Sequence, residues 1–507
     1  MKAKLLAVLL AALLLLPLIA GCRSEESPGE DSQSPDVTDT SSSAGTTDAG
    51  NDPAAPERTF DDLPDADLED RVIKVLTRDE ASTVLWRPID WVCNTVDANS
   101  TEINRAVFER NKRVEERYHC TFAQVMDDNY LAMATAAYMG DTEDYDIIVM
   151  PIIHQINSMA ANGYYMDLAT LDNIRLDDPW WDANTNNSLS LLGRYYTLCG
   201  DVNIVDNLAT WCTVFNKSIA ADYGEVGDLY EAAYAGDWTL EKMYSDARLV
   251  ANEDIGMWGI INEAEASYAF LASAGMFTFV KDQDGVPENN ITRPSFTNVM
   301  LDIYNWMADD SIQVFGDPDI GVGWGVNYDI FAKQDSGLYL LCTLSTIIGP
   351  QFAETTSPYG ILPIPKYSSE QENYVSTFQA GNATGASILV NHSDAEEIAL
   401  VLSAMSAASV DTLTPAYYET TLEQRAGQME DPDALEMLKV IFGNRVIDIG
   451  IVMSGSARTV LTDTIKDREN FSFTSLRGQH ISKMNEDLDR VIKAIQNDFK
   501  PTEESES

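Results

Sequence analysis

The sequence predicts an α/β fold, because strand and helix patterns alternate in its first folded segment. Val72–Leu76 is a short apolar run typical of a strand, and apolar residues recur at helical spacing over Ile103–Tyr118. Cys120–Met126 then resembles a strand, Tyr130–Tyr138 a helix and Asp146–Met150 a buried strand. This order predicts parallel strands with helices on both faces of a sheet.

Chain length predicts more than one compact unit. Roughly 435 of the 507 residues follow the N-terminal segments described below, and length alone divides them into two or three units. Five cysteines remain in this part, an odd number without CxxC spacing, and we interpret them as small buried hydrophobes. The cysteine pattern does not decide whether a disulfide forms.

The N-terminus has the pattern of a cleaved export signal. Lys2 and Lys4 precede the apolar run Leu5–Ala20, which is shorter than the roughly 20 residues that span a bilayer. Ile19-Ala20-Gly21-Cys22 resembles the bacterial lipobox. That resemblance implies that residues 1–22 form a lipoprotein signal peptide and that Cys22 carries the lipid, such as palmitate. An ordinary signal peptide with a chance cysteine is the alternative.

Residues 23–70 have the composition of a disordered acidic tether. Ser, Thr, Gly, Pro, Asp and Glu dominate this stretch, so it cannot bury enough apolar surface to fold. Removing the +2 of the signal peptide and the −13 of the tether from the total of −48 leaves −37 on residues 71–507. Such a surface repels phosphate groups, so we expect no nucleic-acid partner and membrane attachment only through the lipid anchor. A neutral or cationic small molecule is favoured as the ligand.

Polar and aromatic residues follow the first and third predicted strands. In open α/β sheets, ligands bind beyond the carboxyl ends of the strands. The loops in question carry the side chains Arg78, Asp79, Trp86 and Trp91 after the first strand, and His154 and Gln155 after the third. These loops are therefore candidate ligand sites.

A series of short motifs runs through the chain from Val72 to Lys500. In chain order they are Asn104-Arg105-Ala106-Val107, Asp144–Ile148, Gly163–Leu168, Pro179–Asp182, Phe215-Asn216-Lys217, Gly236–Thr239, Tyr359–Pro363 and Pro415–Tyr418. Together they resemble the sugar- and oligosaccharide-binding branch (family 1) of the extracellular solute-binding proteins of ABC importers. The resemblance implies a two-lobed periplasmic-binding-protein-like fold (type II), in which the ligand binds between the lobes and a hinge closes over it.

The resemblance also implies where the chain divides. The crossings between lobes are expected near Asn203–Trp211 and Tyr374–Gly381, with Gly200, Gly381 and Gly385 as hinge positions or ordinary turns. The expected division is 71–205 and 381–430 for the N-terminal lobe, 206–380 and 431–500 for the C-terminal lobe, and 501–507 for a disordered tail.

Carrying the ligand-contacting loops of the family onto this sequence gives a candidate cleft. Its residues are Arg78, Asp79, Trp86, His154, Gln155, Asp206, Asn207, Trp211, Glu265, Ser267, Tyr268, Trp324, Thr343 and Ser345. Thr343 and Ser345 stand where the family commonly has an aromatic residue, so stacking in the second lobe falls to Tyr268 or Trp324. Trp180, Trp181, Trp238, Trp258 and Trp306 are expected in the core.

The resemblance implies a non-enzymatic receptor that captures a carbohydrate and delivers it to the permease of an ABC transporter. We expect a monomer at the cell membrane, facing the extracellular side or the periplasm, without cofactor or metal. GxSxG and HExxH motifs are absent from the sequence, and its four histidines are isolated. An oligopeptide-binding lipoprotein and a secreted glycoside hydrolase with paired carboxylates remain alternatives.

Overall fold

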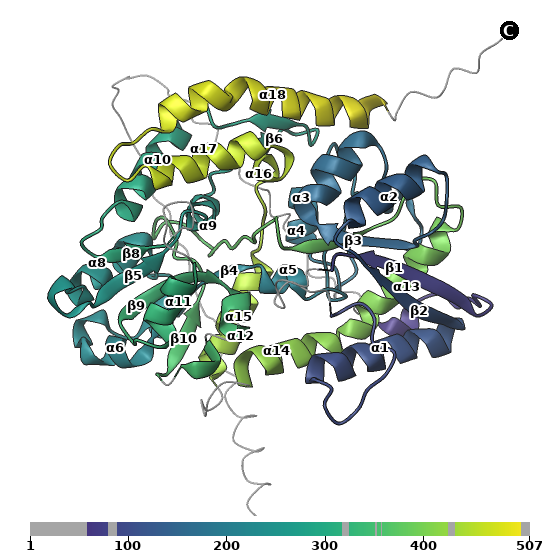
Figure 1. Ribbon diagram of the computed structural model, residues 1–507, viewed down its shortest axis with the longest axis horizontal. Coiled ribbons are helices and arrows are strands. Elements are labelled where there is room, and N and C mark those ends of the chain that lie inside the picture. The colour runs from purple at the N-terminus through teal and green to yellow at the C-terminus, as the bar shows by residue number, and fades with distance from the viewer. Residues whose placement is uncertain are drawn as a thin grey trace, which may run out of the picture. The chain divides into compact units, whose positions relative to one another are not determined.

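The computed structural model describes residues 58–79, 89–316, 324–349, 352–355, 357–423 and 431–497 (Figure 1). Cys22 and the tail 501–507 lie outside these ranges. Within them, no single helix has the length and apolar composition to cross a membrane. The bent pair Ala395–Ser409 and Leu413–Thr420 passes that test, by length and composition alone.

The first sheet has four strands in the order β11-β3-β1-β2. β1 (Arg71–Thr77) pairs in parallel with β2 (Cys120–Met126) and with β3 (Ile147–Pro151), which confirms the predicted parallel arrangement. Every residue of β3 is buried, as expected for a continuous apolar strand covered on both faces. β11 (Thr384–Ser387) pairs antiparallel to β3 from a distant part of the chain.

Helices flank the first sheet, and the residues that begin and end α1 are recognisable in the sequence. α1 (Glu102–Tyr118) begins after Thr101, whose hydroxyl accepts a hydrogen bond from the Asn104 N–H at 3.1 Å. It ends at His119, which has a left-handed φ of 48°. The other helical segments of this part are η1 (Phe60–Asp62), α2 (Tyr130–Met139), α3 (Ile152–His154), the π-helical turn η3 (Gln155–Met159), η4 (Ala160–Asn162), η5 (Leu168–Thr170), α4 (Ala183–Leu189), α13 (Ala395–Ser409) and α14 (Leu413–Glu423).

Residues 58–70, which the sequence prediction assigned to the tether, are instead packed on the first sheet. Phe60, Leu63 and Leu68 are buried in the same cluster as Ile73 and Val75 of β1. Arg117 of α1 donates to the carbonyl of Leu63 at 2.5 Å. Three apolar anchors in an otherwise acidic stretch are too few to change its average composition, which is why composition alone placed the boundary at Asp70.

The second sheet has five strands in the order β10-β4-β9-β5-β8. Its strands are β4 (Trp211–Asn216), β5 (Trp258–Asn262), β8 (Gln313–Phe315), β9 (Gly337–Thr343) and β10 (Tyr359–Leu362). β5 pairs in parallel with β8 and β9, whereas β4 pairs antiparallel with β9 and β10. A separate hairpin joins β6 (Phe279–Lys281) to β7 (Pro287–Asn289).

In the second part of the chain, the structure describes fourteen helical segments before α18. They are α5 (Val205–Leu208), α6 (Lys217–Asp222), η6 (Gly224–Val226), α7 (Leu229–Ala235), α8 (Leu240–Val250), η7 (Glu253–Ile255), α9 (Ala266–Ser273), α10 (Pro294–Met307), α11 (Trp324–Ala332), α12 (Leu344–Ile348), η9 (Phe352–Glu354), α15 (Pro432–Gly443), α16 (Ile449–Met453) and α17 (Gly455–Lys466). The long α18 (Phe473–Asn497) follows them.

Two large apolar clusters form the core. One cluster packs around the first sheet and includes Trp180 and Trp181. The other includes Trp238 and residues from the strands of the second sheet. Of the five tryptophans expected in the core, Trp180, Trp181 and Trp238 are buried there, whereas Trp258 and Trp306 are half-buried and pack against the second cluster. The five described cysteines are free thiols, and all but Cys93 are buried, as predicted for small hydrophobes.

Three chain segments run side by side where the two sheets are connected. Trp211 N–H donates to the Thr377 carbonyl, and Gln379 N–H donates to the Ala209 carbonyl, both at 2.9 Å. On the other side, Val446 N–H donates to the Ser376 carbonyl at 2.9 Å. The first two segments lie within Asn203–Trp211 and Tyr374–Gly381. The third, residues 444–446, lies outside both ranges.

The C-terminal helix α18 and the β6–β7 hairpin also contact the first lobe, which is the part of the protein built around the first sheet. Arg490 of α18 donates to the Asn157 carbonyl at 3.2 Å. Lys281 of the β6–β7 hairpin donates to the Asn187 carbonyl at 2.6 Å and to Ser190 Oγ at 3.0 Å. In Figure 1, α18 accordingly extends over both α10 and the region of α3. The lobes are therefore in contact beyond the three connecting segments.

Candidate functional site

Arg78 and His154 lie at the carboxyl ends of the two neighbouring strands β1 and β3. The side chain of Arg78 is fully buried, and its Nη2 donates to the Asn382 carbonyl at 3.0 Å. His154 is half-buried, with Nδ1 2.9 Å from the Tyr130 hydroxyl. Burial, and then the positive charges of Arg458 and Arg78, lower the pKa of His154, so its imidazole is neutral at neutral pH.

Glu265 and Tyr268 lie in the second lobe, where the chain leaves β5 and enters α9. Glu265 is the N-terminal capping position of α9 and is half-buried. Tyr268, one turn later, is 8% exposed. Burial, and then the negative charge of Glu265, raise the pKa of the Tyr268 phenol, which therefore stays protonated and able to donate a hydrogen bond.

A chain of hydrogen bonds joins Arg78 to Glu265 through the connecting segment that contains Gln379 and Asn382. Arg78 donates to the Asn382 carbonyl, the Asn382 amide donates to Gln379 Oε1, and Gln379 Nε2 donates to Glu265 Oε2. The end of a strand in the first sheet is thus linked to the start of a helix in the second. Polar side chains from both lobes converge here with both donors and acceptors.

Arg458 of α17 is a further member of this group. Its positive charge contributes to the lowered pKa of His154 and offsets part of the rise in the pKa of Tyr268, so its guanidinium is near enough to act on both side chains. Beside Tyr268, a cavity of about 10 Å³, the size of one water, is lined by Thr377, Asp448 and Leu461. We refer to Arg78, His154, Glu265, Tyr268, Gln379, Asn382 and Arg458 as the interlobe cluster.

Gln379, Asn382 and Arg458 were missed by sequence reasoning. Gln379 and Asn382 lie within or just after the predicted crossing Tyr374–Gly381, so position in that segment is the signal that could have found them. Arg458 has no such signal, because an arginine near the start of a helix is ordinary.

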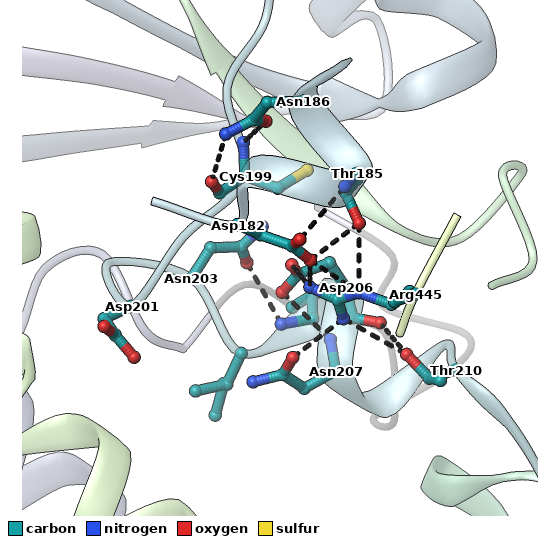
Figure 2. A network of polar contacts seen from close by, with 12 residues as sticks. Asp182, Thr185, Asn186, Cys199, Asp201, Asn203, Asp206, Asn207, Thr210 and Arg445 are labelled. Carbon is teal, nitrogen blue, oxygen red and sulfur yellow. Dashed lines mark hydrogen bonds and ion pairs between the residues drawn. The ribbon is translucent and has the colours of Figure 1, made fainter. Parts of the chain in front are cut away.

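Asp206 and Asn207 are part of a buried network around Arg445 instead (Figure 2). Arg445 Nη2 donates to Asp206 Oδ2 at 2.8 Å, and Nη1 donates to Asn207 Oδ1 at 2.8 Å. The same guanidinium donates to Asp182 and to Thr210. Asp206 is 1% exposed and Arg445 3%, so Asp206 is occupied by an internal ion pair. The resemblance located the crossing but could not reveal its arginine, which comes more than 230 residues later.

Burial and ion pairing act in opposite directions on this network. Burial raises the pKa of Asp206 to about 7, against the attraction of Arg445. Burial alone would lower the pKa of Arg445, but Asp206 and Asp182 raise it on balance. The carboxylates therefore keep the guanidinium charged, and this polar cluster helps to hold the three connecting segments together.

The other predicted residues lie away from the interlobe cluster or in its supporting layer. Gln155 is fully buried, and its amide donates to the carbonyls of Ile148 at 3.1 Å and Gly385 at 2.7 Å, which ties β3 to β11. Trp211 is fully buried in the core. Ser267 Oγ donates to the Ala264 carbonyl at 2.7 Å inside the α9 turn.

Thr343 and Ser345 are hydrogen-bonded to each other, with Oγ atoms 2.8 Å apart, at the end of β9. Asp79 is half-buried beside Arg78. Trp86 lies outside the described residues, and for Trp324 the structure describes the backbone at the start of α11 but not the side chain. The structure thus brings Arg78, His154, Glu265 and Tyr268 together and gives Gln155, Asp206, Asn207, Trp211 and Ser267 internal contacts.

The arrangement suits recognition of a neutral polar molecule. Its members supply hydrogen-bond donors, acceptors and an aromatic ring, and their charges are partly compensated among themselves. Across the described ranges, His, Cys, Asp and Glu form no group of three that could hold a metal ion.

Solved structures show which known proteins share this architecture. A cyclo/maltodextrin-binding protein in complex with maltotetraose aligns over 85% of this chain and 98% of its own, at 12% identity and a TM-score of 0.52. The chain has the fold of solute-binding proteins of ABC transporters. An ABC substrate-binding protein from Listeria monocytogenes in complex with cycloalternan aligns over 84% of this chain and all of its own, at 14% identity and a TM-score of 0.50.

The GacH receptor of Streptomyces glaucescens, solved unliganded and with acarbose, also shares the fold, over 82% of this chain and 99% of its own, at 12% identity and a TM-score of 0.50. No protein-family model matches the sequence, and no curated protein matches it. The comparisons thus confirm the predicted two-lobed α/β architecture of a solute-binding protein. The three structures named above are those of binding proteins or a receptor.

Proposed function

We propose that this protein captures a carbohydrate in the size range of an oligosaccharide between its lobes and delivers it to the permease of an ABC importer. The observation that carries the proposal is the interlobe cluster, in which Arg78 of one lobe and Glu265 of the other are linked through Gln379. A ligand bound there contacts both lobes, so it favours the arrangement in which they are close.

Carbohydrate chemistry fits the cluster. A sugar presents hydroxyl groups that donate and accept hydrogen bonds, together with apolar faces that stack on aromatic rings. Arg78 and Arg458 donate, Glu265 accepts and Tyr268 offers a ring with a protonated hydroxyl. An unpaired buried hydroxyl costs about 1–3 kcal/mol, so such a site discriminates between sugars that differ at one position. The fold neighbours with maltotetraose and cycloalternan support this ligand class.

We further propose that the protein is held at the membrane by lipid on Cys22 and that residues after it serve as a spacer. This rests on the Ile19-Ala20-Gly21-Cys22 motif and on the acidic composition after it. Multiple acyl chains at one residue bind a bilayer far more strongly than a single chain does. Cys22→Ser should release the protein into the medium or leave an uncleaved precursor. Retention of that variant on the cell at the normal size would argue against the anchor.

A thermal-shift screen tests the ligand class. Maltotetraose, cycloalternan and acarbose are the first probes, because the fold neighbours were solved with them, and a mixed oligopeptide pool is the comparison. A ligand present at 100 times its dissociation constant should stabilise the protein by about 2.7 kcal/mol. Stabilisation by peptides alone would favour the oligopeptide alternative. Cleavage of a glycan during incubation would identify an enzyme.

A further inference from the structure

A second cavity lies apart from the interlobe cluster. It has a volume of about 460 Å³, within the range of roughly 300–1,000 Å³ that small-molecule sites occupy. Four stretches that are distant in sequence form its walls: residues 179–184, 200–207, 414–418 and 439–445. In Figure 1, α14 and α15 lie below α5, whereas α9 and α16 lie above it. The cavity and the interlobe cluster have no residue in common.

Aromatic rings supply the apolar part of its wall. Tyr418 and Phe442 contact each other edge to face, with ring centroids 6.0 Å apart. Trp180 and Trp181 also line the cavity. Rings of this kind pack against C–H groups and leave room at their edges for hydrogen bonds.

Polar groups in the wall offer both acceptors and donors. Asp201 Oδ1 accepts from Thr414 Oγ1 at 2.7 Å, and in Figure 2 its carboxylate points away from the Arg445 network. Burial raises the pKa of Asp201 to about 6, so part of the population carries a proton there at mildly acidic pH. Asn207 Oδ1 accepts a hydrogen bond from Arg445 Nη1, and Figure 2 shows the Asn207 amide nitrogen on the side away from that guanidinium.

The charges in the wall bear on the kind of small molecule that fits. Asp182 and Asp201 in the wall are balanced by Arg445 and Lys439, so the wall has no formal net charge with which to select an ion. A neutral molecule whose groups both donate and accept fits this balance. Hydroxyl groups do both.

We infer that this cavity, lined by Tyr418, Phe442, Asp201 and Asn207, is a second ligand site that takes a neutral polyhydroxylated molecule of about monosaccharide size. It is separate from the interlobe cluster and does not depend on the function proposed for that cluster. Its walls include α15, whose capping residue Asp431 is bound by Lys217 and Tyr230 of the second lobe. They also include residues 179–184 of the first lobe. The occupied site thus contacts both lobes.

The structure offers a matched pair of variants. Gly443 lines the cavity, and a Cβ added there would meet nothing within 4 Å, so Gly443→Phe places a ring in the open space without backbone strain. Gly478 of α18 is also free of neighbours within 4 Å and is not part of the wall, so Gly478→Phe is the control. Asp201→Asn is a second test, because it keeps the shape of the side chain and removes its charge.

The readout is ¹⁹F NMR of protein labelled with 5-fluorotryptophan, titrated with glucose, xylitol or myo-inositol. Assignment by Trp→Phe replacement identifies the signals of Trp180 and Trp181. At least one probe should shift these signals saturably in the wild type and in Gly478→Phe. The dissociation constant should rise at least about tenfold in Gly443→Phe and about fivefold in Asp201→Asn.

Two results would overturn the inference. One is that none of the three probes shifts the Trp180 and Trp181 signals, even at 100 times the ligand concentrations used in the thermal-shift screen. The other is equal affinity of the wild type, Gly443→Phe and Asp201→Asn. Loss of cleft binding in the thermal-shift screen, with these signals still shifting, would contradict the proposed function and leave the second site standing.

Discussion

Gln379 donates its side-chain amide to Glu265, and this bond connects the segment that crosses between the lobes to the first turn of α9. Gln379 also accepts from Asn382, whose carbonyl is held by Arg78. A side chain on the connecting segment is thereby in contact with both halves of the candidate cleft. Any change in the separation of the lobes must alter at least one of these bonds.

Loss of either partner of this bond should weaken ligand binding. A hydrogen bond to a charged group contributes about 1.5–3 kcal/mol, so Glu265→Ala and Gln379→Ala should each raise the dissociation constant of the sugar about 10- to 150-fold. Isothermal titration calorimetry measures this directly. Gln479→Ala, on the exposed face of α18, is the control and should bind like the wild type. Unchanged affinity in both cluster variants would remove Glu265 and Gln379 from the site.

Arg445→Ala should be strongly destabilising. It leaves the buried carboxylates of Asp206 and Asp182 without their cation, and breaking a buried pair in this way costs about 3–5 kcal/mol. Urea denaturation gives the free energy of unfolding. Arg248→Ala is the comparison, because Arg248 is 58% exposed and lies 3.7 Å from Asp309, and exposed pairs contribute about 0–1 kcal/mol. Similar losses in the two variants would contradict the role assigned to the network.

Stability should fall as the pH rises from about 4 to 7. Burial raises the pKa of Asp201 and Asp448 to about 6 and that of Asp206 to about 7, each from 3.8. The folded state therefore binds more protons than the unfolded chain in this range, and the free energy of unfolding decreases with pH. His154, whose pKa is lowered, acts in the opposite direction.

Thermal denaturation at pH 5 and pH 8 checks this trend. Asp201→Asn should flatten the profile, because it removes one of the raised groups, and Asp254→Asn on the surface should not. A transition temperature that rises from pH 5 to pH 8 in the wild type would show that other groups outweigh these three carboxyls.

Gly200→Ala should destabilise the protein by about 1–3 kcal/mol, the cost of overpacking. A Cβ at this position would lie 2.3 Å from the Trp180 carbonyl oxygen. Gly381→Ala is the matched control, since its nearest neighbour would be Ile153 Cδ1 at 3.9 Å. Chemical denaturation distinguishes the two. Equal stability would mean that the backbone at Gly200 shifts easily, as a hinge would require.

The sequence predicted local structure better than the distant contacts. The apolar runs of β1, β2 and β3 and the helical spacing of α1 were sufficient to predict a parallel sheet, because each signal lies within one element. β11 was not predicted, since Thr384–Ser387 has no strand pattern of its own and is defined by its pairing with β3. Asp206 was predicted to contact the ligand, but it pairs with Arg445, which could not be inferred without the fold.

The same limit applies to the candidate site. Arg78, His154, Glu265 and Tyr268 follow strands, and the rule that ligands bind beyond strand ends identifies such positions. Gln155 follows a strand too, yet its amide faces inward to the carbonyls of Ile148 and Gly385. The direction of a side chain after a strand depends on the path of the next few residues, which sequence spacing does not specify.

The pairing of β11 with β3 has a consequence for the order in which the protein folds during synthesis. β1, β2 and β3 are complete once about 151 residues have been made, but the edge of β3 has no partner until Thr384–Ser387 emerges. The whole second sheet is synthesised in between. An unpaired strand edge can associate with other chains, and distant pairing is slow. The edge of β3 is therefore open to such association until β11 pairs with it.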